Sequence, residues 1–294
     1  MCPKTRKYFV LASLLLTLAP VGSAQEGPMP FVINQFDPDI GTLVSVGFDS
    51  ATDRVWLYNS VGDFLMSYSA TGTFLSSIDR PGEAGNDDDI DFASGAFTLG
   101  ATLVPEDSLL FVDGESGTAD IYAVDPATGI VIASLTTDFG VDHVVGGAYH
   151  RTRDTFFLVE DWFNLGAPST VAEINPATGV VINSFRTDAF LDYDVNFGDL
   201  DIDASTGNLL VVSSAESTIL ELTPTGSFVR VLPLPGGVTS LSGIAVVDDK
   251  IGEVYVSGTG GDIWHLGGMA GDSIFSDGFE SGDTSAWTAQ QPPP

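Results

Sequence analysis

Short apolar segments alternate with polar turns along most of the chain, and no segment longer than one helical turn has the apolar spacing of an amphipathic helix. One turn recurs with little change, and each copy is followed by an apolar strand. Its four copies are residues 69–72 (SATG), 125–129 (DPATG), 175–179 (NPATG) and 223–226 (TPTG). Their glycines lie 57, 50 and 47 residues apart. A period of about 50 residues that contains only strand-like segments predicts an all-β propeller, with one four-stranded blade per repeat.

The repeat occurs five times, and each unit opens on a small residue beside an apolar one. The five openings are Val46-Gly47-Phe48, Leu99-Gly100-Ala101, Gly146-Gly147-Ala148, Gly198-Asp199-Leu200 and Ser242-Gly243-Ile244. Small residues suit innermost strands, because these strands crowd around the propeller axis. We therefore predict five blades. Six blades is the alternative, since residues 80–95 are long enough to hide another hairpin, although their Gly and Asp content favours a loop.

The fifth unit lacks a fourth strand of its own, because the repeat ends after Leu266. The N-terminal residues 31–37 (FVINQFD) are similar to residues 181–187 (VINSFRT), which form the predicted fourth strand of another unit. We predict that residues 30–36 complete the last blade and close the ring, which removes exposed sheet edges. The alternative is that these residues are only a linker.

The two ends of the chain differ from the repeats. Lys4, Arg6 and Lys7 precede an apolar stretch at residues 8–19, and Gly22-Ser23-Ala24 supplies small residues for cleavage. We predict a signal peptide at residues 1–24, cleaved after Ala24, and hence a secreted protein, with a membrane anchor as the alternative. The propeller then covers residues 25–270, followed by a partly disordered tail at residues 271–294. The only cysteine, Cys2, is lost with the signal peptide.

Charge restricts the partners. The chain has 10 Lys and Arg residues against 40 Asp and Glu residues, which gives a formal net charge of −30 at pH 7. Such a surface repels nucleic acid and anionic membranes, so we predict neither as a partner. We predict a monomer that binds a protein or a small-molecule ligand through its acidic face.

Acidic residues gather in the segments that link one unit to the next. Two of these segments share the pattern D-x-D-x-[DN]-F, whose alternating oxygen ligands are suited to calcium. The candidate ligands are Asp87, Asp89, Asp91, Asp192, Asp194 and Asn196. Both segments depart from the EF-hand loop, because Phe92 and Phe197 stand where the loop needs glycine and no Glu follows at the twelfth position. The alternative is a pair of solvated acidic loops.

No pattern of residues predicts catalysis. The sequence contains no Gly-x-Ser-x-Gly nucleophile elbow, and its three histidines are His143, His150 and His265. We interpret His143 as an exposed loop histidine and predict no catalytic residue.

The cadence of the repeat resembles the NHL and YVTN repeats of exported bacterial propellers, most closely at residues 198–213 (GDLDIDASTGNLLVVS). The resemblance covers residues 30–267 and implies a propeller fold, which serves binding proteins, lyases and lactonases alike. Calcium-dependent lactonases of the gluconolactonase type carry Asn or Asp just before the first-strand glycine. The corresponding residues here are Val46, Leu99, Gly146, Phe197 and Ser242. This difference argues against lactonase chemistry and predicts a largely apolar channel mouth.

The tail has a resemblance of its own. Residues 272–287 are similar to an IF-x-DGFESGD-x-S-x-W stretch found near the C-termini of exported proteins of Gram-negative bacteria. Together, these features predict a secreted, acidic propeller that acts as a binding or scaffold module, stabilised by calcium. The alternative function is a propeller-type, metal-assisted hydrolase, lactonase or lyase.

Overall fold

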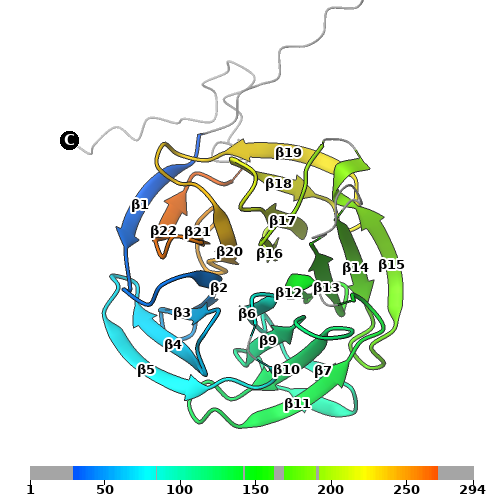
Figure 1. Cartoon of the computed structure of the whole chain (residues 1–294). Coiled ribbons are helices and arrows are strands. Elements are labelled where there is room, and N and C mark those ends of the chain that lie inside the picture. Colours follow the sequence, from blue (N-terminus) through cyan, green and yellow to red (C-terminus); the bar gives the residue numbers. More distant parts are fainter. Residues whose placement is uncertain (1–28, 84, 142, 162–168, 190–191, 271–294) are drawn as a thin grey trace, which may run out of the picture.

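The computed structural model describes residues 29–270, apart from residues 84, 142, 162–168 and 190–191. Five four-stranded antiparallel sheets surround a central axis as a five-bladed β-propeller, as predicted (Figure 1). The predicted signal peptide at residues 1–24 and the predicted tail at residues 271–294 lie outside the described residues. Within the described part, no helix is long and apolar enough to span a bilayer.

Each blade runs outward from an innermost strand. Blade 1 consists of β2 (Leu43–Asp49), β3 (Arg54–Asn59), β4 (Phe64–Ser69) and β5 (Phe74–Asp79). Blade 2 consists of β6 (Asp88–Phe92), β9 (Leu109–Asp113), β10 (Asp120–Val124) and β11 (Val131–Thr136). Blade 3 consists of β12 (Val144–His150), β13 (Thr155–Glu160), β14 (Thr170–Ile174) and β15 (Val181–Arg186). Blade 4 consists of β16 (Asp199–Asp203), β17 (Asn208–Val212), β18 (Thr218–Leu222) and β19 (Phe228–Pro233). Blade 5 consists of β20 (Leu241–Val246), β21 (Val254–Gly258), β22 (Ile263–Gly267) and β1 (Phe31–Phe36).

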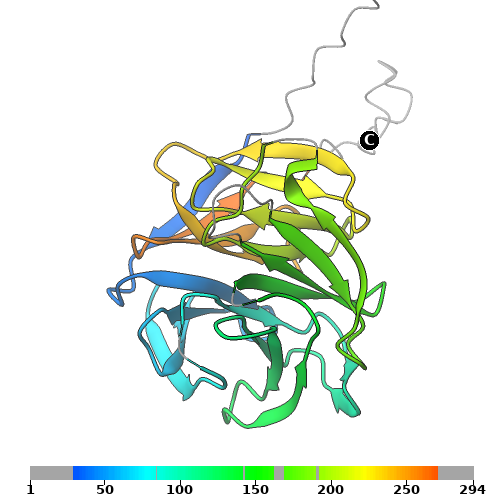
Figure 2. The same cartoon turned by 45° about the vertical axis from the view of Figure 1, so that its right-hand side comes forward.

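The N-terminal strand closes the ring. β1 pairs antiparallel with β22, with Phe31 opposite Gly267 and Phe36 opposite Ile263. The blue N-terminal strand lies beside the orange strands of the last unit in Figures 1 and 2. The Asn34 amide also donates a hydrogen bond to the Ala70 carbonyl of blade 1, 2.9 Å away. The prediction that residues 30–36 complete the last blade is therefore confirmed, and the outer edge of β22 is covered.

Packing between blades holds the ring together. The buried apolar residues form five clusters, and each cluster joins two neighbouring blades. Between blades 1 and 2, Tyr58 meets Phe111 edge to face with ring centres 5.8 Å apart, and Trp56 lies 6.3 Å from Phe92. Burial of a large apolar side chain contributes about 1.5–3 kcal/mol, so each contact between blades contributes several such terms.

The second unit departs from the predicted layout. Residues 80–95 are not only a loop, because they contain the innermost strand β6. The predicted first strand at Leu99-Gly100-Ala101 instead belongs to a hairpin of β7 (Phe97–Leu99) and β8 (Thr102–Val104), where Gly100 has a φ of +60°. β6 reads DDIDF, with only two apolar residues, so its composition hides the strand. β6 is buried because the neighbouring innermost strands β2 and β12 pack against it, although its own sequence is mostly polar.

Candidate functional site

Two innermost strands carry aspartates at equivalent positions. In β6, Asp89 lies opposite Val112 and Asp91 opposite Leu110. In β16, Asp199 lies opposite Val212 and Asp201 opposite Leu210, so the registers match. Side chains two residues apart on a strand share a face, and β6 and β16 are the innermost strands of their blades, next to the propeller axis (Figure 1). We call Asp89, Asp91, Asp199 and Asp201 the four channel aspartates.

The first aspartate of each strand pair, Asp89 in β6 and Asp199 in β16, links neighbouring blades. Ser45 of blade 1 donates a hydrogen bond of 2.6 Å to Asp89 Oδ1, and the Gly147 N–H of blade 3 donates one of 3.0 Å to Asp89 Oδ2. The Ile244 N–H of blade 5 donates to Asp199 Oδ2 over 2.8 Å. These carboxylates therefore satisfy backbone N–H groups on the open edges of the adjacent innermost strands. Both side chains are 1% exposed.

The second aspartate of each strand, Asp91 in β6 and Asp201 in β16, lies at one mouth of the channel. Asp201 accepts a hydrogen bond from the Val246 N–H, and both Asp91 and Asp201 line a cavity of about 310 Å³. The turns between first and second strands form this cavity, so we call it the hairpin-side cavity. Its wall also includes His150, Arg151 and Asp248. The cavity offers a ligand a polar pocket with acidic groups at its base.

The channel concentrates negative charge away from water. Burial raises the pKa of all four channel aspartates above the ordinary value of 3.8. Charge repulsion from Asp89 adds to the rise in the pKa of Asp91 and of Asp199. The ion pairs among the described residues include none of the four. Such a group of buried carboxylates is stable only if protons or a cation reduce its charge.

The opposite mouth has a second cavity, of about 440 Å³, which we call the connection-side cavity. Its wall is formed by residues just before the innermost strands and just after the second strands. The lining includes Thr42, Asn86, Asn196, Phe197, Ser214 and Thr259. The two cavities therefore differ in character, because five acidic residues line the first, whereas amide, hydroxyl and apolar groups line the second.

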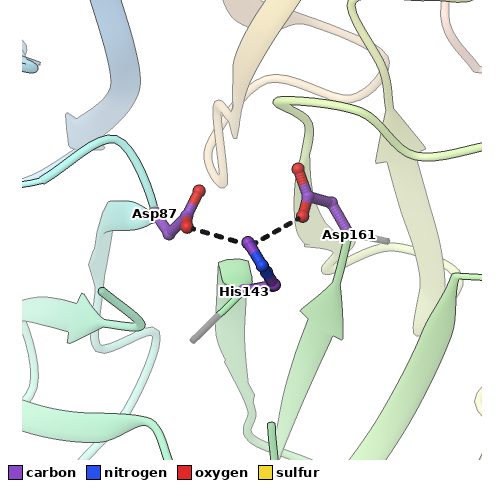
Figure 3. Close-up of side chains that lie close together, drawn as sticks. All are labelled: Asp87, His143 and Asp161. Carbon is purple, nitrogen blue, oxygen red and sulfur yellow. Dashed lines mark ion pairs between the residues drawn. The ribbon is translucent and has the colours of Figure 1, made fainter. Parts of the chain in front are cut away.

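Three titratable side chains converge beside the connection-side cavity (Figure 3). His143 Nδ1 lies 3.3 Å from Asp87 Oδ2 and 3.6 Å from Asp161 Oδ1. Asp161 is 2% exposed, and its Oδ2 accepts a hydrogen bond of 3.1 Å from the Phe197 N–H. Burial, and next the charge of Asp161, raises the pKa of Asp87. The nearby His143 offsets part of this rise. His143 is therefore not a plain exposed loop residue, since it lies between two carboxylates.

The predicted calcium ligands do not form two equivalent loops. Asp87, Asp89 and Asp91 alternate along β6 and the residue before it, whereas residues 192–197 precede β16 as a connection. Asp192 is exposed, Asp194 Oδ1 accepts a hydrogen bond of 3.4 Å from Ser169, and Asn196 lines the connection-side cavity. The counterpart of β6 is β16 itself. The β7–β8 hairpin, inserted before β9, hides this match in the sequence.

The prediction of a largely apolar channel mouth is wrong for the hairpin-side mouth, where Asp91 and Asp201 line the cavity, whereas Phe197 and Ser242 do line the connection-side cavity. The prediction used the residue before the first-strand glycine of each unit. In the second unit it used Leu99, which belongs to β7 and not to the innermost strand β6. On the other innermost strands, the residues in register with the channel aspartates are Ser45 and Gly47, Gly146 and Ala148, and Gly243 and Ala245. Of these six, Gly146 alone is among the five residues on which the prediction rested. The D-x-D pairs in β6 and β16 were the available signal for Asp199 and Asp201. No sequence signal marks Asp161.

Comparisons with known proteins add little about function. No family model matches the chain, and no curated protein matches it. A protein of unknown function from Bacteroides caccae is 16% identical with a TM-score of 0.46, covering 73% of this chain and 69% of its own. A catalytically inactive virginiamycin B lyase from Staphylococcus aureus, solved with quinupristin, is 12% identical with a TM-score of 0.44, covering 76% of this chain and 66% of its own. The chain thus spans about two thirds of the length of each, and these likenesses carry no argument about function.

Proposed function

We propose that this protein is a secreted, acidic binding or scaffold module whose propeller is stabilised by calcium between the four channel aspartates. Their convergence without an ion pair carries the proposal. Calcium takes six to eight oxygen ligands, of which carboxylates are the strongest, and extracellular calcium sites bind in the range of about 10⁻⁴–10⁻³ M. Bound calcium would offset the charge that burial makes costly. Of the six ligands predicted from the sequence, this proposal keeps Asp89 and Asp91.

Three features of the sequence support the wider assignment. Residues 1–24 have the pattern of a signal peptide, the repeats resemble those of exported NHL and YVTN propellers, and the tail resembles that of exported Gram-negative proteins. The net charge of −30 disfavours nucleic acid and anionic membranes as partners. The sequence predicted the ligand at the acidic face formed by the connections between units. Because Asp91 and Asp201 line the hairpin-side cavity at the opposite mouth, we place the ligand, a protein segment or a small molecule, there instead, and we propose that the protein acts as a monomer.

Calcium titration tests the proposal directly. The melting temperature of the protein is measured by calorimetry in calcium and in EGTA. At free calcium 100-fold above Kd, binding adds about 2.7 kcal/mol to the free energy of unfolding. For a domain of this size that corresponds to a rise of about 5–10 °C.

Variants locate the ion. Asp89→Asn and Asp199→Asn should each lose most of the calcium-dependent rise, because each removes a charged ligand while keeping an oxygen acceptor. Asp192→Asn removes the same charge from an exposed position and should keep the full rise. A melting temperature that calcium does not change, or an equal rise in all four proteins, would contradict the channel site.

A metal-assisted hydrolase, lactonase or lyase is the second candidate function. It is favoured by one observation, namely that Asp91 and Asp201 open onto the hairpin-side cavity, where a metal could keep a coordination position for substrate. Calcium-dependent turnover of lactone or ester substrates, lost in Asp201→Asn, would support it.

A further inference from the structure

The geometry points to a second metal site, at the opposite mouth of the channel, in which Asp87, His143 and Asp161 bind a divalent transition metal of the zinc class. This site is separate from the four channel aspartates and from the calcium proposed there. It also involves two residues, His143 and Asp161, that the sequence did not mark as ligands.

The three side chains come from different parts of the fold but present their ligand atoms to one point. Asp87 directly precedes β6, His143 directly precedes β12, and Asp161 directly follows β13. One ligand atom from each residue lies within 4.8 Å of the other two. Figure 3 shows both carboxylates directed toward the His143 ring. Three ligands on the ends of rigid strands give a site that is largely formed before metal binds.

An independent observation also indicates a missing ligand. Asp161 is 2% exposed, yet its Oδ1 has no hydrogen-bond partner among the described residues. Its other oxygen is held by the Phe197 N–H, so the carboxylate is oriented with Oδ1 toward His143. A buried carboxylate oxygen without a donor is costly, and native structures normally satisfy such atoms with a proton donor or an ion. A metal bound to Asp161 Oδ1 would supply the partner that this oxygen lacks.

The mixture of ligand atoms selects the metal. One imidazole nitrogen and two carboxylate oxygens suit zinc, iron or nickel, whereas calcium prefers oxygen ligands only. Three protein ligands leave at least one coordination position open, as in catalytic rather than structural zinc sites. The site adjoins the connection-side cavity, which is lined by Asn86, next to Asp87, and by Phe197, whose N–H donates a hydrogen bond to Asp161. A water molecule or an oxygen atom of a small ligand would occupy it.

Zinc binding to the full protein is the first test. The protein is stripped with chelator, saturated with calcium and then titrated with zinc by calorimetry. We expect one zinc ion per chain. Because calcium is present throughout, absence of zinc binding would overturn this site without touching the calcium proposal.

Ligand variants then assign the site. Loss of a residue that only supports a ligand typically weakens metal affinity by about 10–100-fold, so His143→Gln and Asp161→Asn should each weaken zinc binding by at least about 10-fold. Asp87→Asn provides a third variant at a less buried position. Asp192→Asn, which removes an acid from an exposed connection on the same face, should change zinc affinity less than about twofold. Melting temperatures without zinc confirm that each variant is folded.

Cobalt gives a readout that a purely structural role would not change. Cobalt in place of zinc should produce visible absorption bands that His143→Gln alters in position or intensity. If zinc affinity and the cobalt spectrum are the same in His143→Gln as in the unmodified protein, the metal binds elsewhere and the assignment is wrong. If zinc does not bind at all, the three side chains only contact one another and the metal site is wrong.

Discussion

Blades 2 and 4 differ from blades 1, 3 and 5 at one pair of positions, although all five have the same strand order. Where β6 and β16 carry two aspartates each, the other innermost strands carry Ser, Gly or Ala. The propeller fold therefore does not need the aspartates, because three blades form without them. What the fold does need is small neighbours beside them: a Cβ added to Gly146 would lie 2.2 Å from Asp199 Oδ1. The innermost strands with aspartates and those with small residues fit together, because the small residues leave room for the carboxylates.

The strongest test introduces an aspartate into an innermost strand that has none at these positions. Gly146→Asp would add a fifth carboxylate to the channel, directly against Asp199, with a steric overlap and an added buried charge. We expect it to destabilise the fold by more than about 4 kcal/mol, enough to prevent folding in many domains. Gly146→Ala, which adds the overlap alone, should cost about 1–3 kcal/mol. Urea unfolding measures both. Equal stability of the two variants would show that charge in the channel has little cost.

The pH dependence of stability measures the same charge without adding atoms. Burial, then the charge of Asp113, raises the pKa of Asp88 to about 8, and burial raises the pKa values of the four channel aspartates. In this range the folded chain binds more protons than the unfolded chain, so its stability decreases as pH rises. His150 and His265 have pKa values lowered by burial and act in the opposite direction only below their ordinary pKa of 6.5.

We therefore expect the free energy of unfolding, measured in EGTA, to fall between pH 6.5 and pH 8 by at least about 2 kcal/mol, since each retained proton contributes about 1.4 kcal/mol per pH unit. Asp89→Asn combined with Asp199→Asn should reduce the slope, and saturating calcium should flatten it. A stability that rises with pH over this interval would mean that the channel carboxylates are already ionised at pH 6.5.

The smallest expected effect on stability concerns Ser45 of blade 1, whose side chain contacts a channel aspartate. Ser45 Oγ donates to Asp89 and accepts a hydrogen bond of 2.7 Å from the Ile90 N–H. Ser45→Ala should cost about 1 kcal/mol, because Asp89 keeps its bond from Gly147. Ser242→Ala is the matched control, since Ser242 Oγ contacts only Ser257 Oγ among the hydrogen bonds of the described side chains. Chemical denaturation that finds equal costs would indicate that Asp89 does not depend on Ser45.

The candidate site could be predicted only in part. The alternation of acids marks Asp89 and Asp91 as candidates, but it predicts a loop there, since β6 has too few apolar residues to be recognised as a strand. Asp199 and Asp201 lie in a unit whose strand was placed correctly, and the inserted β7–β8 hairpin concealed their match with β6. His143 was noticed as one of only three histidines, whereas Asp161 carries no pattern and was missed.

The repeated four-stranded unit and the N-terminal strand that completes the last blade can be predicted from the sequence alone, which also favours five blades over six. These features depend on pairing between neighbouring strands, which the turn residues and the alternation of apolar residues encode locally. Which acids lie close together, and where His143 lies relative to them, became known from the folded chain. Closure of the ring brings strands of separate blades to one axis, and contacts across that axis depend on blade geometry that no local pattern records.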